Sequence, residues 1–291
     1  MPRTIEQGFQ DFLTTLTPSG LESEAAKGHR NSIESRLKQE CGYLPRFTRI
    51  GSFGNATSIS GFSDVDYLAC LPNPYLTENS DYSLQKVRKT LDERFPATGV
   101  YVDCPAVVCP FGAQRSESTE IVPADYVAES NGYKVYDIPD CNGGWMKASP
   151  DAHNEYVRSV NSKLDNRVKP LIRFVKAWKY YRQVPINSFY LELRVAKYAA
   201  TEKSIVYDID VKVLLCYLRD TGLADMQDPA GVSGLIPACK TVAAYTDAIS
   251  KLTTAATRAE KAREFTSAGD ISAAFDYWRL LYDNAFPSYY Y

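Results

Sequence analysis

The spacing of apolar residues divides the chain into two parts of different character. In residues 1–149, helical patterns at 5–16 and 22–41 are separated by Thr-Pro-Ser-Gly, a combination that ends one helix and begins another. Shorter apolar runs follow, and they predict β-strands at 46–50, 64–71, 99–110, 117–122 and 133–138, with one helix at 82–95. The first half is therefore predicted to be a mixed α/β lobe.

Residues 150–291 carry almost only the helical period. The predicted helices span 151–165, 167–182, 187–200, 208–222, 239–267 and 270–285. We therefore expect an α+β protein with a mixed central sheet in a lobe at 1–149 and a helical lobe at 150–291. Ligands commonly bind where two lobes meet, so the active site is expected in the cleft between them.

One segment of the first lobe is dense in small and acidic residues. Residues 50–67 read Ile-Gly-Ser-Phe-Gly-Asn-Ala-Thr-Ser-Ile-Ser-Gly-Phe-Ser-Asp-Val-Asp-Tyr, which predicts a tight turn at Gly51 and Ser52 and a helical turn at 55–59. Glycine lets the backbone approach a phosphate, and Ser52 adds a hydroxyl donor near the free N–H groups of the helical turn. This half of the segment is typical of a site for an anionic triphosphate.

Asp64 and Asp66 open the strand that follows. Residues two apart on a strand share a face, so their side chains leave it about 6.5–7 Å apart along the chain. Two carboxylates on one face can hold two divalent cations about 3.5–4 Å apart, as phosphoryl transfer requires. Mg²⁺ is the expected metal, because it prefers carboxylate and phosphate oxygens, and Mn²⁺ accepts the same ligands. The alternative is an ordinary turn before a solvated strand, but the two halves together favour a nucleotide site.

A basic stripe runs along the predicted helix at 167–182. Its members share a face distinct from the apolar one, and they are Lys169, Arg173, Lys176 and Lys179. The segment Asn-Ser-Phe-Tyr-Leu-Glu at 187–192 begins eleven residues after Lys176. A solvated basic face is the commoner fate of such a stripe, so the stripe alone does not define a site.

Composition limits the partners that the chain can have. A formal charge of −2 and a pI near 5.8 do not favour binding to long DNA or RNA. No apolar run reaches the roughly 18 residues of a membrane helix. We therefore expect no association with a membrane and a cytoplasmic location. The seven cysteines lack Cys-x-x-Cys pairs, which predicts reduced, mostly buried thiols instead of a disulfide framework or zinc site.

The Gly-Ser pair, its spacer and the Asp-x-Asp between apolar residues resemble the signature of the polymerase-β-type nucleotidyltransferase superfamily. The resemblance implies a third acidic residue on a later strand. Glu120 is the best candidate, because related enzymes carry an acid before apolar-Val-Pro-Ala, which is the pattern at 120–124. Asp is usual at that position, so Glu120 is a departure, and an exposed strand carboxylate is its alternative role. The fallback candidates are Asp103 and Asp125.

In detail, nearly the whole chain most resembles the bacterial relatives of cyclic GMP-AMP synthase, the CD-NTases of anti-phage signalling. There a Lys and a Ser bind the triphosphate and an aromatic ring stacks on a base, which implies these roles for Lys176, Ser188 and Phe189. Tyr190 is an alternative stacking ring. Lys179 and Thr57 are further nucleotide-binding candidates. The structural alternative is a solvated charge for Lys179, and for Thr57 it is capping or packing of the helical turn.

The resemblance implies a metal-dependent nucleotidyltransferase that joins nucleoside triphosphates, ATP or GTP or both, and releases pyrophosphate. Its product would be a cyclic dinucleotide or small cyclic oligonucleotide, a second messenger that a separate effector protein reads. The N-terminal helices would cross both lobes, and a monomer is one of the oligomeric states left open. One rival is terminal nucleotide transfer to RNA, a linear oligonucleotide or a protein. Another is a nucleotide-binding regulatory protein without catalysis, which the intact Asp64 and Asp66 argue against.

Overall fold

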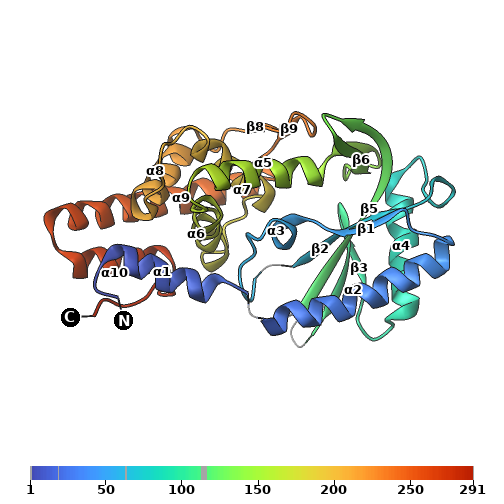
Figure 1. Ribbon diagram of the computed structural model, residues 1–291, viewed down its shortest axis with the longest axis horizontal. Helices are drawn as coiled ribbons and strands as arrows, with labels where there is room; N and C mark the ends of the chain where they lie inside the picture. The colour runs from blue at the N-terminus through green and yellow to red at the C-terminus, as the bar shows by residue number, and fades with distance from the viewer. Residues whose placement is uncertain (1, 19, 63, 113–116, 291) are drawn as a thin grey trace. The chain divides into compact units, whose positions relative to one another are not determined.

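A computed structural model describes residues 2–18, 20–62, 64–112 and 117–290, and these form two compact units (Figure 1). The sheet unit consists of Pro18–Glu155 and Ala230–Gly234. The helical unit consists of Met1–Thr17, Tyr156–Pro229 and Leu235–Tyr291. Helix α5 (Pro150–Lys163) begins in the sheet unit and ends in the helical unit.

The sheet unit is built on a mixed sheet, as the sequence predicts. Within the described residues its main strand order is β1-β2-β5-β4-β3, with β6 attached through β5 and β7 through β6. The strands are β1 (Arg46–Arg49), β2 (Val65–Cys70), β3 (Tyr101–Asp103), β4 (Ala106–Phe111), β5 (Glu117–Ser130), β6 (Tyr133–Pro139) and β7 (Trp145–Ala148). Strands β2 and β5 run parallel, and the other pairs are antiparallel.

Helices α2 (Gly20–Cys41) and α4 (Ser80–Arg94) cover one face of this sheet. Apolar side chains of both helices pack there against alternate strand residues, among them Val65, Tyr67 and Ile121. The residues between them in sequence point the other way, where Leu68 and Ala124 belong to a smaller core. The even-numbered side chains of β2 therefore lie on the face away from α2 and α4.

Three local predictions differ from the structure. The helical turn expected at 55–59 lies earlier, as α3 (Gly51–Gly54), because the helix starts on the glycine itself. The strand expected at 99–110 is a hairpin of β3 and β4, since the chain turns at Cys104 and Pro105 so that Asp103 pairs with Ala106. Strand β5 continues to residue 130 because β6 pairs with its second half. The short elements η1 (Asn73–Tyr75) and β7 were not predicted.

A disulfide joins Cys104 and Cys141, whose Cα atoms are 5.6 Å apart. The prediction of reduced thiols is wrong for this pair. The two residues are 37 positions apart and are brought together only by the fold, a proximity that cysteine spacing does not encode. Among the thiols that remain free, burial raises the pKa of Cys109 to about 12, so this side chain stays protonated at neutral pH.

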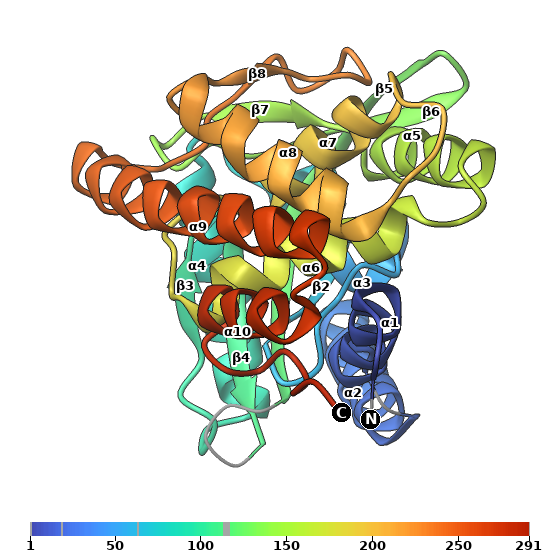
Figure 2. The ribbon, with the colours of Figure 1, turned by 90° about the vertical axis from the view of Figure 1, so that its left-hand side faces the viewer.

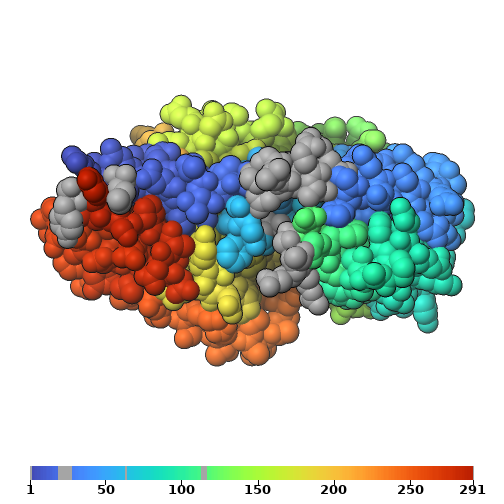
Figure 3. Space-filling model, turned by 90° about the horizontal axis from the view of Figure 1, so that it is seen from below, coloured from blue at the N-terminus to red at the C-terminus, as the bar shows by residue number. Residues whose placement is uncertain are grey.

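The helical unit collects the first helix and the last ones. Its elements are α1 (Ile5–Leu16), most of α5, α6 (Val168–Tyr181), α7 (Ser188–Ala199), α8 (Tyr207–Asp220), α9 (Val242–Ala268) and α10 (Ile271–Leu281), with the short strands β8 (Met226–Gln227) and β9 (Leu235–Ile236). Helix α9 lies between α8 and α10 (Figure 2). Helix α1 lies beside the C-terminal segment (Figure 3) because Phe9 packs edge-on against Trp278 and Phe286. Among the described residues, no helix is long and apolar enough to span a bilayer.

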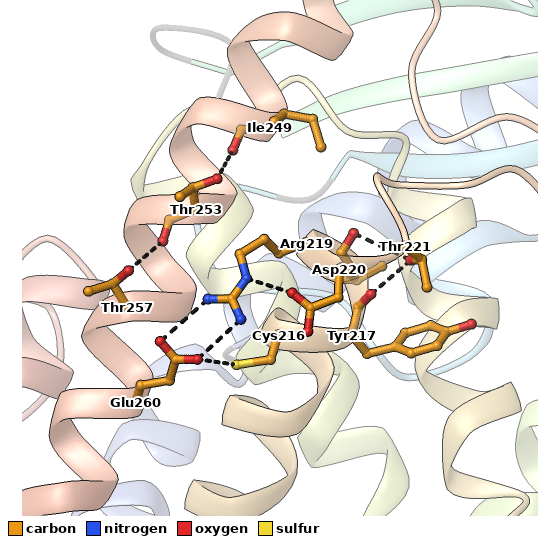
Figure 4. A network of polar contacts seen from close by, with 10 residues as sticks. Cys216, Tyr217, Arg219, Asp220, Thr221, Ile249, Thr253, Thr257 and Glu260 are labelled. Carbon is orange, nitrogen blue, oxygen red and sulfur yellow. Dashed lines mark hydrogen bonds and ion pairs between the residues drawn. The ribbon is translucent and has the colours of Figure 1, made fainter.

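A polar network joins α8 to α9 (Figure 4). The guanidinium of Arg219 donates to both carboxylate oxygens of Glu260, at 3.2 and 3.4 Å. The Cys216 thiol donates to the same carboxylate at 3.3 Å. Burial and this hydrogen bond raise the pKa of Cys216 to about 11, so the thiol stays protonated and the network helps to hold the helices together.

Candidate functional site

The two parallel strands place two carboxylates side by side. Asp66 on β2 and Glu120 on β5 are register partners, and neighbouring strands lie about 4.8 Å apart. Both residues are partly buried, and their place in the alternation puts them on the face away from α2 and α4. The predicted adjacency of the Glu120 strand to the Asp64 strand is therefore confirmed.

The other acidic candidates are placed differently. Asp64 lies just before β2 and is exposed, one position away from the paired strand. Asp103 is on β3, which β4 and β5 separate from β2. Asp125 pairs with Asp137 on β6, and burial followed by the charge of Asp137 raises the pKa of Asp125. The strand order therefore favours Glu120 over the two fallback residues as the partner of Asp66.

Gly51 makes close contact with the Asp66 carboxylate. A Cβ at position 51 would lie 2.1 Å from Oδ2 of Asp66, and the backbone there has a φ of +59°. The preceding N–H, that of Ile50, donates to the Asp66 carbonyl at 2.9 Å. Both the space and the conformation therefore require glycine, which places α3 directly against the acidic strand.

Ser52 and Thr57 are linked to each other. The carbonyl of Ser52 accepts from the Thr57 N–H at 2.8 Å and from its Oγ1 at 3.5 Å. Thr57 is fully buried, whereas Ser52 is partly exposed. This arrangement gives Thr57 a role in closing the turn after α3, and its contact with a nucleotide stays a prediction. Ser63, next to the first acid, lies outside the described residues.

The acidic pair provides part of the ligand set that Mg²⁺ requires. Across the part of the chain that the structure describes, no group of three or more His, Cys, Asp or Glu side chains is arranged to hold a metal ion. Mg²⁺, however, is commonly held by one or two carboxylates and completes its octahedron with water and substrate phosphates. Asp66 and Glu120 provide hard carboxylate oxygens on adjacent strands, so they fit a metal that binds together with a triphosphate.

In the helical unit, Lys179 and Ser188 are in contact. The Lys179 ammonium, near the end of α6, donates to Oγ of Ser188, the first residue of α7. The same ammonium lies 4.7 Å from the centroid of the Tyr180 ring, whose hydroxyl is 3.3 Å from Ser188 Oγ. Asn187 caps α7 by accepting from the Phe189 N–H at 3.0 Å. A cation and a hydroxyl donor are thereby gathered where α7 begins.

Lys176 has a different environment. Its side chain is 1% exposed, and its Nζ lies 3.5 Å from a carboxylate oxygen of Glu192 on α7. The sequence pairs Lys176 with Ser188, but the structure pairs Lys179 with Ser188 and Lys176 with Glu192. The phosphate contact of Lys176 stays a prediction, and the geometry favours Lys179 as the lysine that acts with Ser188.

The two aromatic candidates differ in exposure. Phe189 is 38% exposed, whereas Tyr190 is fully buried and its hydroxyl donates to the Ala224 carbonyl at 2.8 Å. The Arg194 guanidinium also lies 5.0 Å from the centroid of the Tyr190 ring. Of the two rings, Phe189 is the one with surface exposed to a base.

The remaining members of the basic stripe are partly desolvated. Burial lowers the pKa of Lys169, an effect that the negative charge of Glu192 opposes. Burial also lowers the pKa of Arg173, whose guanidinium donates to Oγ1 of Thr17 at 3.4 Å. The simplest interpretation of the stripe was a uniformly solvated basic face. The structure differs from it, because these two side chains are partly buried.

Comparison with known proteins identifies the family. Residues 3–161, more than half of the chain, match the model of the Second Messenger Oligonucleotide or Dinucleotide Synthetase domain. The chain belongs to this synthetase family. The matched segment contains Gly51, Asp66 and Glu120, whereas Lys179 and Ser188 lie beyond it. The resemblance to bacterial CD-NTases is confirmed.

Two curated relatives and one solved structure agree with this assignment. The chain is 25% identical to a cyclic AMP-AMP-AMP synthase of Acinetobacter sp., over 98% of this chain and 86% of that protein. It is 28% identical to a probable cyclic nucleotide synthase of Bacillus cereus, over 58% of this chain, and the match spans only 52% of that relative's length. The structure of E. coli MS115-1 CdnC with ATP matches with a TM-score of 0.74 at 17% identity, covering 97% of this chain and 98% of CdnC. That match shows that the predicted fold class is correct.

Proposed function

We propose that this protein is a metal-dependent nucleotidyltransferase that joins nucleoside triphosphates into a cyclic dinucleotide or small cyclic oligonucleotide. The observation that carries the proposal is the register of Asp66 with Glu120, together with the contact of Gly51 on the Asp66 carboxylate. These features place a glycine-led turn, suited to phosphate, beside two carboxylates, suited to metal. Membership in a family named for such synthesis supports the same conclusion.

In the sheet unit, Asp64, Asp66 and Glu120 would hold two Mg²⁺ ions, which Mn²⁺ could replace. When bound there, the ions would neutralise phosphate charge and stabilise the charge that develops during phosphoryl transfer. The tight turn at Gly51 would bring backbone N–H groups to a phosphate, and the Ser52 hydroxyl would donate to a phosphate oxygen. These residues thus account for both the metal and the triphosphate in our proposal.

In the helical unit, Lys179 and Ser188 would bind phosphate oxygens, since the Lys179 ammonium and the Ser188 hydroxyl are already in contact there. Phe189 would stack on a base, an interaction worth about 1–3 kcal/mol per base that does not select the base. The substrates would be ATP, GTP or both. ATP is the first choice to test, because one relative is named a cyclic AMP-AMP-AMP synthase and the CdnC structure contains ATP.

The reaction joins two nucleotides and then closes a ring. A ribose hydroxyl of one nucleotide loses its proton and attacks the α-phosphate of another. The new phosphodiester bond forms as the bond to pyrophosphate breaks, and a second transfer of the same kind closes the ring. The product would act in CBASS-type anti-phage signalling in the cytoplasm, where a separate effector protein would bind it.

The test is incubation of the purified protein with all four nucleoside triphosphates and Mg²⁺ or Mn²⁺, followed by phosphatase treatment and mass spectrometry. We expect a phosphatase-resistant product whose mass identifies the bases and the number of nucleotides. A variant with Asp64→Asn and Asp66→Asn is the matched negative control. A phosphatase-sensitive linear product would favour terminal transfer, and the absence of any product or pyrophosphate with either metal would contradict the proposal.

A further inference from the structure

His29 joins helix α2 to the first residue of β5. Its Nε2 lies 2.7 Å from Oε2 of Glu117, and its ring stacks on Phe111 of β4 with centroids 3.9 Å apart and planes 3° apart. Phe95 meets the Phe111 ring edge-on at 5.0 Å. Glu117 and Phe111 are themselves register partners. The side chains of His29, Phe111 and Glu117 therefore connect the end of β4 and the start of β5 to α2.

This end of β5 pairs with the last residues of β4. Within the described residues, the pairing of β2 with β5 begins at Val65 and Thr119, and the pairing of β4 with β5 includes Glu117 and Ser118. Opposite Ser118 stands Pro110, which has no backbone N–H to donate. The side-chain contact of His29 therefore acts beside a position of the ladder at which one backbone donor is missing.

Glu120 is the third residue of the strand after Glu117. The alternation of β5 places Glu117 on the face of α2, beside His29, and Glu120 on the opposite face. His29 therefore does not touch the carboxylate of Glu120. It can act on that carboxylate only through the backbone, by keeping the first residues of β5 in place so that Glu120 stays opposite Asp66.

We propose that His29 is a positioning residue for the metal-binding carboxylate of Glu120, acting through its contact with Glu117. The inference rests on the proposed function, because only a carboxylate that binds metal needs such placement. In metal sites, residues that orient the ligands commonly change metal affinity or activity by about 10–100-fold when they are replaced. Because His29 acts through three residues of backbone, the lower end of that range is expected.

The main variants are His29→Phe and His29→Gln. Phenylalanine keeps a ring to stack on Phe111 but removes the bond to Glu117, whereas glutamine provides an amide donor that can restore the bond. Glu117→Ala removes the same contact from the strand side. The control is Glu93→Gln, which removes the charge from a pair between α2 and α4, where Arg36 lies 2.8 Å from Glu93. That pair resembles the His29 contact in length but does not involve β5.

Two measurements are made on each full-length variant. Binding of Mn²⁺ is followed by electron paramagnetic resonance in the presence of a non-hydrolysable ATP analogue, and amide hydrogen exchange is followed over residues 117–122. We expect His29→Phe and Glu117→Ala to weaken Mn²⁺ binding about tenfold and to speed exchange at the start of β5. His29→Gln should recover most of the affinity, Glu93→Gln should match the wild type, and kcat of His29→Phe at saturating metal should stay within about threefold of the wild type.

Unchanged Mn²⁺ affinity in His29→Phe would overturn the inference, and so would an equal loss in Glu93→Gln, which would indicate general destabilisation. A wild-type protein that binds Mn²⁺ but makes no nucleotide product would instead contradict the proposed function. In that case the affinity and exchange measurements would still decide whether His29 positions the strand.

Discussion

Replacing Gly51 with alanine tests the contact between α3 and the acidic strand. A Cβ at that position would lie 2.1 Å from Oδ2 and 2.8 Å from Cγ of Asp66. Close contacts between carbon and oxygen rarely fall below about 3.3 Å, so the carboxylate would have to move by roughly 1.2 Å. The φ of +59° adds about 1–2 kcal/mol of strain for a residue with a Cβ.

The expected loss of activity follows from the displacement. A misplacement of about 1 Å in a catalytic group can lower the rate about 100-fold, which corresponds to about 2.7 kcal/mol of transition-state stabilisation. The strain acts separately, because it lowers the free energy of unfolding without changing the chemistry. We therefore expect Gly51→Ala to fold, to be less stable by about 1–2 kcal/mol and to turn over nucleotides about 100 times more slowly.

Gly99→Ala is the matched control. Gly99 has a φ of +75°, so alanine is strained there too, but a Cβ would have no atom within 4 Å. The assay compares the initial rate of pyrophosphate release with chemical denaturation for both variants. Similar losses of stability with a large difference in rate would support the contact with Asp66. A Gly51→Ala rate within about threefold of the Gly99→Ala rate would refute the reasoning.

Three further predictions concern other contacts. The double variant Asp64→Asn and Asp66→Asn should make no product yet keep its circular dichroism spectrum, and retained turnover would remove both residues from the site. Lys179→Ala should raise the KM for ATP about tenfold with a smaller change in kcat, because it removes a charged donor, and an unchanged KM in steady-state kinetics would contradict that role. Asp151→Ala should lower the free energy of unfolding by about 1–2 kcal/mol, since it removes two hydrogen bonds from Arg46 at 2.6 and 2.8 Å. Equal denaturant midpoints would show that this pair adds no stability.

Much of the fold could be predicted because apolar periodicity reports burial directly. Apolar periodicity indicates the helices at 5–16 and 22–41 and the strand of Asp66, and the structure contains all three. What failed depended on contacts distant in sequence. Nothing near Cys104 indicates Cys141 as its partner, and β5 extends beyond 122 because β6 pairs with it.

The limits were similar at the candidate site. A helical stripe shows that Lys176 and Lys179 share a face, but it cannot tell which of them meets Ser188. That choice depends on how α6 and α7 pack, and the packing places Lys179 on Ser188 and Lys176 on Glu192. No motif singled out His29, because its partner Glu117 is 88 residues away and the contact exists only after the strand has formed.

The negative charges of Asp66 and Glu120 affect where contacts that support the two strands can act. Two ionised carboxylates on adjacent strands repel each other, and bound cations would remove that repulsion. A side chain that bound either carboxylate directly would oppose this repulsion but would also occupy the ligand positions that a metal needs. Two contacts act on these strands elsewhere: the Ile50 N–H donates to the Asp66 carbonyl, and His29 contacts Glu117 on the opposite face of β5. Both contacts help to hold the strands in register without using the carboxylates of Asp66 and Glu120.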